Sequence, residues 1–265
     1  MPRVELETLL ASGAHFGHLT RRWNPKMKPF IFMERNGIHI IDLKKTQELL
    51  DVACNAVSNI VAEGKKPLFV ATKKPAREVV EEEAKRCNSF YVTERWLGGM
   101  LTNFSTIRKS VKRLTNIEKM ESDGTFESIT KKERLFLSRE RDKLQKVLSG
   151  VVDMARLPGM VFVVDVKKEA IAVNEATRLG IPVVAIVDTN CDPQKIDYPI
   201  PANDDALKSV QIIAKAISDA VLEGQERVAA QRAMEAEQEV SKSEKGHHSE
   251  KESKAQHSEK DSKES

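Results

Sequence analysis

Short apolar runs that alternate with helical segments place the tightest constraint on how this chain can fold. Residues 67–71 read Pro-Leu-Phe-Val-Ala, a continuous apolar run of the kind that forms a strand buried on both faces of a sheet. Similar runs predict further strands at 38–43, 90–92, 161–166 and 183–187. Helices are predicted at 4–14, 49–62, 76–86, 169–179 and from about 204 to beyond 221. Strand–helix alternation with short links is typical of a parallel, doubly wound sheet, so we expect an α/β fold.

A turn and two charged helical stretches interrupt this alternation between residues 95 and 150. Arg95 and Trp96 are interpreted as an exposed cation and aromatic ring ahead of a turn at Gly98-Gly99. Apolar residues then recur at helical spacing, and Ser122-Asp123-Gly124 breaks the helical pattern. Two helices joined at that break would form an antiparallel hairpin that projects from the core, since only a narrow seam is apolar.

The end of the chain differs from the rest in composition. From residue 235 onward there are nine acidic residues against six lysines and no aromatic residue. Such a segment cannot bury enough apolar surface to offset chain entropy. Because the whole chain carries +3, residues 1–234 carry +6, a modest basic excess that is compatible with nucleic acid. We expect a discontinuous sheet domain (1–103 and 151–225), a hairpin (104–150), and a helical extension with a disordered, charged tail (226–265).

Cations and aromatic rings are interleaved between residues 16 and 35, where two prolines limit helix formation. Cations beside exposed rings suit phosphates and unstacked bases, so this loop is predicted to face RNA. Phe30 and Phe32 are the exception, because they fit a strand packed on the core. Lysines that follow the 67–71 strand, at a helix N-terminus, are placed to hold a phosphate. The mixed charges of the hairpin are also typical of a solvated helix face. The candidate RNA-binding residues are Phe16, Arg21, Arg22, Trp23, Lys26, Lys28, Lys73, Lys74, Arg95, Trp96, Arg108, Lys109, Lys112 and Arg113.

Acidic residues lie at the ends of two of the last predicted elements. Asp188 ends the 183–187 strand, and Asp204-Asp205 begin the last helix. Carboxyl ends of parallel strands meet at one edge, so these carboxylates are expected to lie together, joined by His18 if the N-terminal loop folds over that edge. His18, Asp188, Asp204 and Asp205 would suit a structural divalent metal ion. The alternative gives each carboxylate a local role: Asp204 as a helix N-cap, Asp205 favoured by the helix dipole, and Asp188 bonding a turn.

Motifs for catalysis and nucleotide binding are absent from the sequence. GxGxxG, GxxxxGK[ST] and HExxH do not occur, and no nucleophile–base pair is evident. We therefore predict no catalytic residues, no required cofactor and no small-molecule substrate. Cys54, Cys87 and Cys191 are far apart and are interpreted as buried thiols. No apolar run approaches the roughly 20 residues of a membrane span, so a cytosolic protein without a membrane partner is expected.

Several motifs in one unbroken order resemble a known family. They read HFGHLTRRWNPKMKPFIF, RWLGGMLTN, Leu157-Pro158-Gly159, and IPVVAIVDTNCDP followed by IPANDDA. Together they resemble the family of the second protein of the bacterial small ribosomal subunit, over roughly residues 4–225. The resemblance implies a non-catalytic protein of the bacterial ribosome with a flavodoxin-like sheet and a coiled-coil hairpin. It also implies contacts with small-subunit rRNA and with neighbouring ribosomal proteins, including the large mRNA-capturing one.

Two readings from other classes stay open on the sequence. One is a cytosolic metal-dependent α/β enzyme that uses the edge at Asp188, and the other is an RNA-binding regulator that acts off the ribosome. The missing phosphate loop argues against the enzyme.

Overall fold

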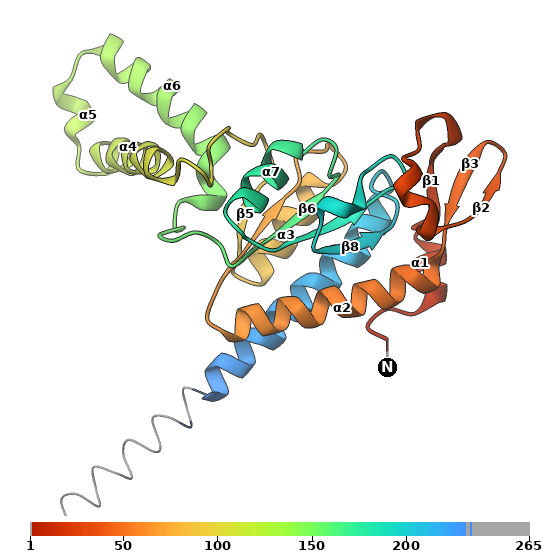
Figure 1. Ribbon diagram of the computed structural model, residues 1–265. Helices are drawn as coiled ribbons and strands as arrows, with labels where there is room; N and C mark the ends of the chain where they lie inside the picture. Colours follow the sequence, from red (N-terminus) through yellow and green to blue (C-terminus); the bar gives the residue numbers. More distant parts are fainter. Residues whose placement is uncertain (1, 232–233, 235–265) are drawn as a thin grey trace, which may run out of the picture.

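A five-stranded parallel sheet forms the centre of the computed structural model, which describes residues 2–231 and 234 (Figure 1). The strands lie in the order β5–β4–β6–β7–β8. Their bounds are β4 (Pro67–Val70), β5 (Phe90–Val92), β6 (Met160–Val164), β7 (Val183–Val187) and β8 (Tyr198–Pro201). Every neighbouring pair in this sheet is parallel; Phe69, for example, pairs with Tyr91 on one side and Phe162 on the other. The predicted α/β class with a parallel sheet is confirmed.

The strand β8 lies between the predicted 183–187 strand and the helix predicted from about 204, where no strand was predicted. Pro199 and Pro201 lack backbone donors, which argues against a central strand. The structure resolves the conflict by position, because β8 pairs only with β7 and is the last strand of the sheet. An edge strand tolerates proline, since one of its two sides needs no ladder hydrogen bonds.

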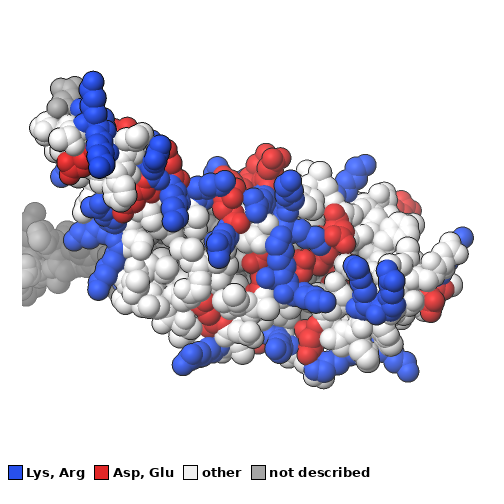
Figure 2. Space-filling view, turned by 90° about the horizontal axis from the view of Figure 1, so that it is seen from above, with Lys and Arg blue, Asp and Glu red and all other residues white. Residues whose placement is uncertain are grey.

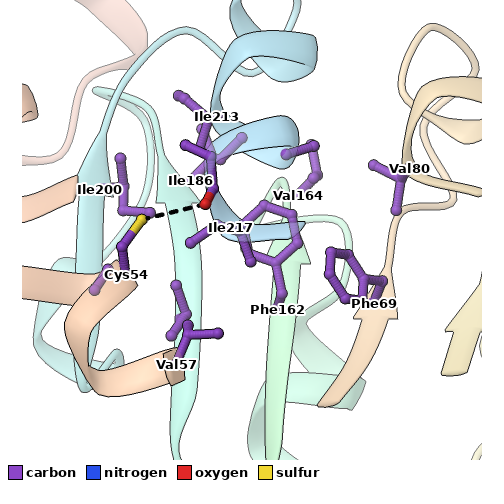
Figure 3. Packing of buried hydrophobic residues seen from close by; sticks show 14 of the residues in the cluster. Cys54, Val57, Phe69, Val80, Phe162, Val164, Ile186, Ile200, Ile213 and Ile217 are labelled. Carbon is purple, nitrogen blue, oxygen red and sulfur yellow. Dashed lines mark hydrogen bonds between the residues drawn. The ribbon is translucent and has the colours of Figure 1, made fainter. Parts of the chain in front are cut away.

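Helices cover both faces of the sheet, and the strand residues alternate between two cores. One core joins Phe69, Phe162 and Ile186 to α2 (Leu43–Ala62), α3 (Arg77–Arg86) and the C-terminal helix 207–231 (Figure 3). There the Phe69 and Phe162 rings meet edge to face, with 5.4 Å between centroids. Cys54 lies in this core with Sγ 3.6 Å from the Ala216 carbonyl oxygen. All three cysteines are buried free thiols, as predicted.

The second core lies under α7 (Ala170–Arg178) and the loop that follows β5. It contains alternate residues of the same strands, such as Leu68 and Val163, together with Met100 and Leu101 from the loop. The loop before the projecting arm is thus part of the main core.

An antiparallel three-stranded sheet near the N-terminus was not predicted. After α1 (Leu6–Ala11), the strands β1 (Phe16–Leu19), β2 (Ile31–Arg35) and β3 (Ile38–Ile41) pair in the order β1–β3–β2. Two 3-10 turns, η1 (Thr20–Arg22) and η2 (Pro25–Phe30), connect β1 to β2. The expectation that Phe32 packs on the core is wrong: its side chain lies on the edge strand β2 and is 70% exposed. Phe30 does pack against the second core.

A helical arm projects from one end of the sheet (Figure 1). It consists of α4 (Phe104–Ser122), the short α5 (Thr125–Ser128) and α6 (Lys131–Leu148), followed by the turn η3 (Ser149–Val151). Near the base, Ile107, Val111 and Leu114 belong to the second core of the sheet. Farther out, Ile117, Phe126 and Leu137 form a separate small cluster. The arm therefore has its own apolar contacts only in its outer half.

The C-terminal helix continues beyond residue 225, since residues 226–231 are helical. The predicted charged tail lies outside the described residues. Among residues 2–231, no helix combines the length and apolar character that a membrane span requires.

A candidate nucleic-acid-binding surface and an acidic cluster

The N-terminal loop (residues 16–35, which include β1, η1, η2 and β2) lies across the carboxyl end of β7. Hydrogen bonds from its backbone to Thr189 hold it there. The Asn24 backbone N–H donates to the Thr189 carbonyl oxygen at 2.8 Å, and the His18 N–H donates to Thr189 Oγ1 at 2.8 Å. Gly17 permits this approach, because an added Cβ would lie 2.5 Å from Thr189 Cγ2. These contacts anchor the backbone of the loop on the edge of the sheet.

The cations of this loop differ in their surroundings. Arg21, Arg22 and Lys28 are exposed. Lys26 instead pairs with Asp192, with 2.6 Å between Nζ and Oδ2. Lys and Arg side chains, with acidic groups between them, cover much of the face seen in Figure 2, on both the arm and the body.

The aromatic candidates of the loop are also unequal. Phe16 is 48% exposed. Trp23 is half-buried, because its ring packs on the buried His39 at 4.9 Å between centroids. The Phe16 ring in turn packs on His15, with 4.0 Å between centroids, so both rings are only partly available to a partner.

The expectation that Trp96 is exposed is wrong. Its side chain is only 7% exposed, and its indole Nε1 donates to Glu175 Oε1 at 3.1 Å. Backbone N–H groups of Gly99, Leu101 and Thr102 donate to the same carboxylate at 2.8, 2.9 and 3.1 Å. Arg95 stays exposed.

The Glu175 carboxylate is the centre of this loop. The Thr102 hydroxyl also lies within hydrogen-bond distance, 3.2 Å from Oε2. Burial alone would raise the pKa of Glu175, but hydrogen bonds from Thr102, Trp96 and the loop backbone outweigh it and lower the pKa. Sequence reasoning missed Glu175, although an acidic residue on the apolar face of a predicted helix was the available signal.

The arm cations divide in the same way. Lys109 and Lys112 are exposed and line an open cavity of 370 Å³ on α4. Arg108 is half-buried and donates from Nη1 to the carbonyl oxygens of Val152 and Met154, both at 3.1 Å. Arg113 pairs across the arm with Glu140 through Nε and Nη2, at 3.2 and 2.9 Å. Lys109 and Lys112 are free to face a partner, while Arg108 and Arg113 also stabilise the arm.

The four residues predicted as metal ligands lie together at the carboxyl edge of the sheet. One ligand atom from each of His18, Asp188, Asp204 and Asp205 lies within 4.8 Å of the others. His18 Nδ1 is 3.0 Å from Asp188 Oδ2, and His18 Nε2 is 3.5 Å from Asp205 Oδ2. The hydrogen bond to Asp188 raises the pKa of His18.

Asp204 is the most constrained group of this cluster. Its side chain is fully buried, and within the described part of the chain its Oδ2 has no hydrogen-bond partner. Burial, followed by the charges of Asp188 and Asp165, raises the pKa of Asp204 to about 7. A buried carboxylate oxygen without a donor is costly, so the site fits an added cation or proton.

A lysine already supplies part of the positive charge. Lys73 Nζ lies 2.7 Å from Asp204 Oδ1, 2.6 Å from Asp205 Oδ1 and 3.5 Å from Asp165 Oδ2. Burial favours a lower pKa for Lys73, but its hydrogen bonds to Asp204 and Asp205 raise it. Lys73 is thus bound to the acidic cluster, whereas its neighbour Lys74 is exposed.

The local roles proposed as an alternative are only partly seen. Asp188 Oδ1 does accept locally, from the Thr189 N–H at 2.5 Å and hydroxyl at 3.0 Å. Asp204 is not the helix cap, because Asn203 Oδ1 accepts from the backbone N–H groups of Asp205 and Ala206. The donor set of one imidazole and three carboxylates suits a divalent cation.

The fold and this surface define a class: an α/β protein that presents exposed cations and a partly exposed aromatic ring beside the carboxyl end of its sheet. This is the surface type of nucleic-acid-binding proteins.

Comparison with known proteins gives the family. Residues 9–224 match the family described as ribosomal protein S2. The small ribosomal subunit protein uS2 of Chloroherpeton thalassium is 64% identical over 223 residues, which cover 84% of this chain and 89% of that relative. The protein of the same name from Cytophaga hutchinsonii is 62% identical over 219 residues, covering 83% and 86%. That from Chlorobium luteolum is 57% identical over 240 residues, covering 91% and 92%.

The chain belongs to the ribosomal protein S2 family. Its members are structural proteins of the bacterial ribosome, so this chain is a cytoplasmic, ribosome-associated protein and not an enzyme. The family requires no cofactor.

Proposed function

We propose that the chain is a structural constituent of the bacterial small ribosomal subunit and binds small-subunit rRNA through its N-terminal loop. The observation that carries this proposal is the loop itself, which exposes Arg21, Arg22 and Lys28 together with part of the Phe16 ring. Cations bind phosphates, and an exposed ring stacks on an unpaired base. Lys74, Arg95, Lys109 and Lys112 extend the proposed contact toward the arm.

Contacts with neighbouring ribosomal proteins, including the large mRNA-capturing one, are part of the same proposal. The exposed apolar side chains of β2 support a protein contact: Phe32 is 70% and Met33 48% exposed. Consecutive strand residues point to opposite faces, so each face of this edge strand offers one exposed apolar side chain to a partner.

We also infer a flavodoxin-like, doubly wound sheet and a coiled-coil arm. In chain order the parallel strands lie 2-1-3-4-5, which is the flavodoxin-like order, and helices cover both faces. The apolar cluster in the outer arm and the Arg113–Glu140 pair across it support the coiled coil.

The rRNA contact is tested by replacing Arg21, Arg22 and Lys28 with alanine. Incorporation into small subunits in a salt-washed gradient should fall, while the melting temperature stays nearly unchanged, because exposed cations contribute little to stability. A matched control replaces three exposed lysines outside the loop, Lys65, Lys208 and Lys215. Equal incorporation of the two triple variants and the parent protein would refute the contact. Parent protein that stays at the top of the gradient would favour a regulator acting off the ribosome.

A structural divalent ion at His18, Asp188, Asp204 and Asp205 is a further proposal. The buried Asp204 Oδ2 without a donor supports it, and a bound ion would fix the loop on the sheet edge. Untagged protein should contain close to one equivalent of metal, and Asp204→Asn and His18→Ala should each lose it. A chelator should lower the melting temperature of the parent protein but not of these variants. Substoichiometric metal in the parent protein, or no effect of the chelator, would leave Lys73 as the resident cation.

A further inference from the structure

A pocket of 250 Å³ lies beside the N-terminal loop, at the carboxyl ends of β6 and β7. Three segments of the chain line it. Asn24 comes from the loop, Lys167 from the turn before α7, and Asn174 from α7 itself. Asn190 and Lys195 come from the segment after β7. It borders the acidic cluster, because Cys191 lines the pocket and lies within 4.8 Å of Asp204 and Asp165, but none of His18, Asp188, Asp204 and Asp205 lines it.

The polar groups of the pocket are mostly donors. Asn24 Oδ1 already accepts from the Lys26 N–H at 3.0 Å, and Asn190 Oδ1 accepts from Cys191 Sγ at 3.0 Å. Each amide is therefore oriented with its NH₂ group left to donate. Lys167 and Lys195 add two exposed ammonium groups.

The one acid that lines the pocket is already neutralised. Asp192 Oδ2 binds Lys26 Nζ at 2.6 Å, and its Oδ1 accepts from the Gln194 N–H at 3.1 Å. The hydrogen bond from Lys26 lowers the pKa of Asp192. The pocket thus offers donors and positive charge to a ligand rich in acceptors.

Apolar side chains complete the lining. Ala170 is exposed and offers its methyl group, while the buried Val166 and Val173 close the floor of the pocket. The N-terminal end of α7 at Ala170 adds its favourable dipole for an anion. A bare phosphate would gain nothing from the methyl groups. A flat, acceptor-rich base linked to a phosphate would use every part of the lining.

We propose that this pocket binds one unstacked nucleotide of RNA, with its base against Ala170 and Asn174 and its phosphate at Lys167 and Lys195. The inference rests on the proposed rRNA contact of the N-terminal loop. Asn24 belongs both to that loop and to the pocket, so an RNA strand held by the loop passes next to the pocket.

The test uses the full-length protein and small subunits reconstituted without it. Two variants alter the pocket, Lys167→Ala/Lys195→Ala and Asn174→Leu, and Lys208→Ala/Lys215→Ala is the charge-matched control on the opposite helix. The pocket variants should bind roughly tenfold more weakly, because each removes hydrogen-bond donors that the pocket offers to the nucleotide. The double lysine variant should also reduce the salt slope by roughly 0.7 for its lost phosphate contact. Reagents that modify unpaired bases should find one rRNA base protected by the parent and the control, and reactive with both pocket variants.

Unchanged affinity and an unchanged protection pattern with both pocket variants would overturn the proposal. The loop variant with Arg21, Arg22 and Lys28 replaced separates the two failures. If it loses binding while the pocket variants do not, the loop contact stands and the pocket is wrong. If neither loses binding, the rRNA contact itself is wrong. A photo-crosslinker at position 174 that joins protein instead of RNA would also overturn the inference.

Discussion

A single carboxylate fixes the loop that joins the sheet to the arm. Glu175 on α7 accepts from the Trp96 indole and from the backbone N–H groups of Gly99, Leu101 and Thr102, although it lies 79 positions away from Trp96 in the sequence. Hydrogen bonds to a charged acceptor are worth about 1.5–3 kcal/mol each when one partner is removed. Several such donors on one buried group make Glu175 a positioning residue for everything that follows the loop.

Replacing Glu175 by glutamine should destabilise the protein by about 2 kcal/mol or more, because the new amide brings two donors into a site built from donors. Chemical denaturation at pH 7 measures this, with Glu82→Gln on the exposed side of α3 as the control. The pKa of Glu175 is lowered from its ordinary value of 4.5 by these hydrogen bonds, although burial opposes them. Its contribution is therefore complete above pH 4.5 and is lost as the pH falls through the lower folded pKa. The stability gap between parent and variant should narrow in that acid range, and a pH-independent gap would contradict the argument.

At the scale of elements, the sequence predicted best those strands that can be recognised from their own residues alone. The buried strands β4, β6 and β7 are continuous apolar runs, and their assignment needed no partner. The strand β8 was missed because Pro199 and Pro201 are allowed only by its edge position, which the sequence does not reveal.

The N-terminal sheet was missed for a related reason. The apolar Phe32 is exposed and 3-10 turns precede β2, so the alternation of apolar and polar residues that marks a strand is not visible there. Only part of the hairpin between β2 and β3 could therefore be recognised from the sequence. The site shows the same limit: exposed cations such as Arg21 could be anticipated from composition. The pairing of Lys26 with Asp192, and the burial of Trp96, depend on partners far away in the chain.

At the scale of the whole molecule, the division into sheet and arm does not coincide with the division between cores. Ile107, Val111 and Leu148 of the arm are buried with the sheet strands, whereas Ile117, Phe126 and Leu137 form their own cluster. Burying one such side chain contributes about 1.5–3 kcal/mol, and a typical domain has a net stability of only about 5–15 kcal/mol. Loss of the inner arm residues would therefore remove much of the stability of the sheet, and loss of the outer ones would not.

Two deletions with the same Gly/Ser bridge test this division. Removing Asn116 to Asp142 takes away only the outer arm, so the remaining protein should unfold cooperatively with a melting temperature close to that of the parent. Removing Ser105 to Ser149 takes Ile107, Val111, Leu114 and Leu148 out of the second core, so that protein should lose cooperative unfolding and bind a hydrophobic dye. Calorimetry and dye fluorescence on the two proteins measure both effects. A cooperative transition in the longer deletion would mean that the whole of 104–150 is an independent domain. The boundary between the sheet domain and the arm would then lie at the base of the arm, as predicted from the sequence. Loss of cooperativity in the shorter deletion would mean that the outer cluster stabilises the sheet through the helices, and that the molecule unfolds as one unit.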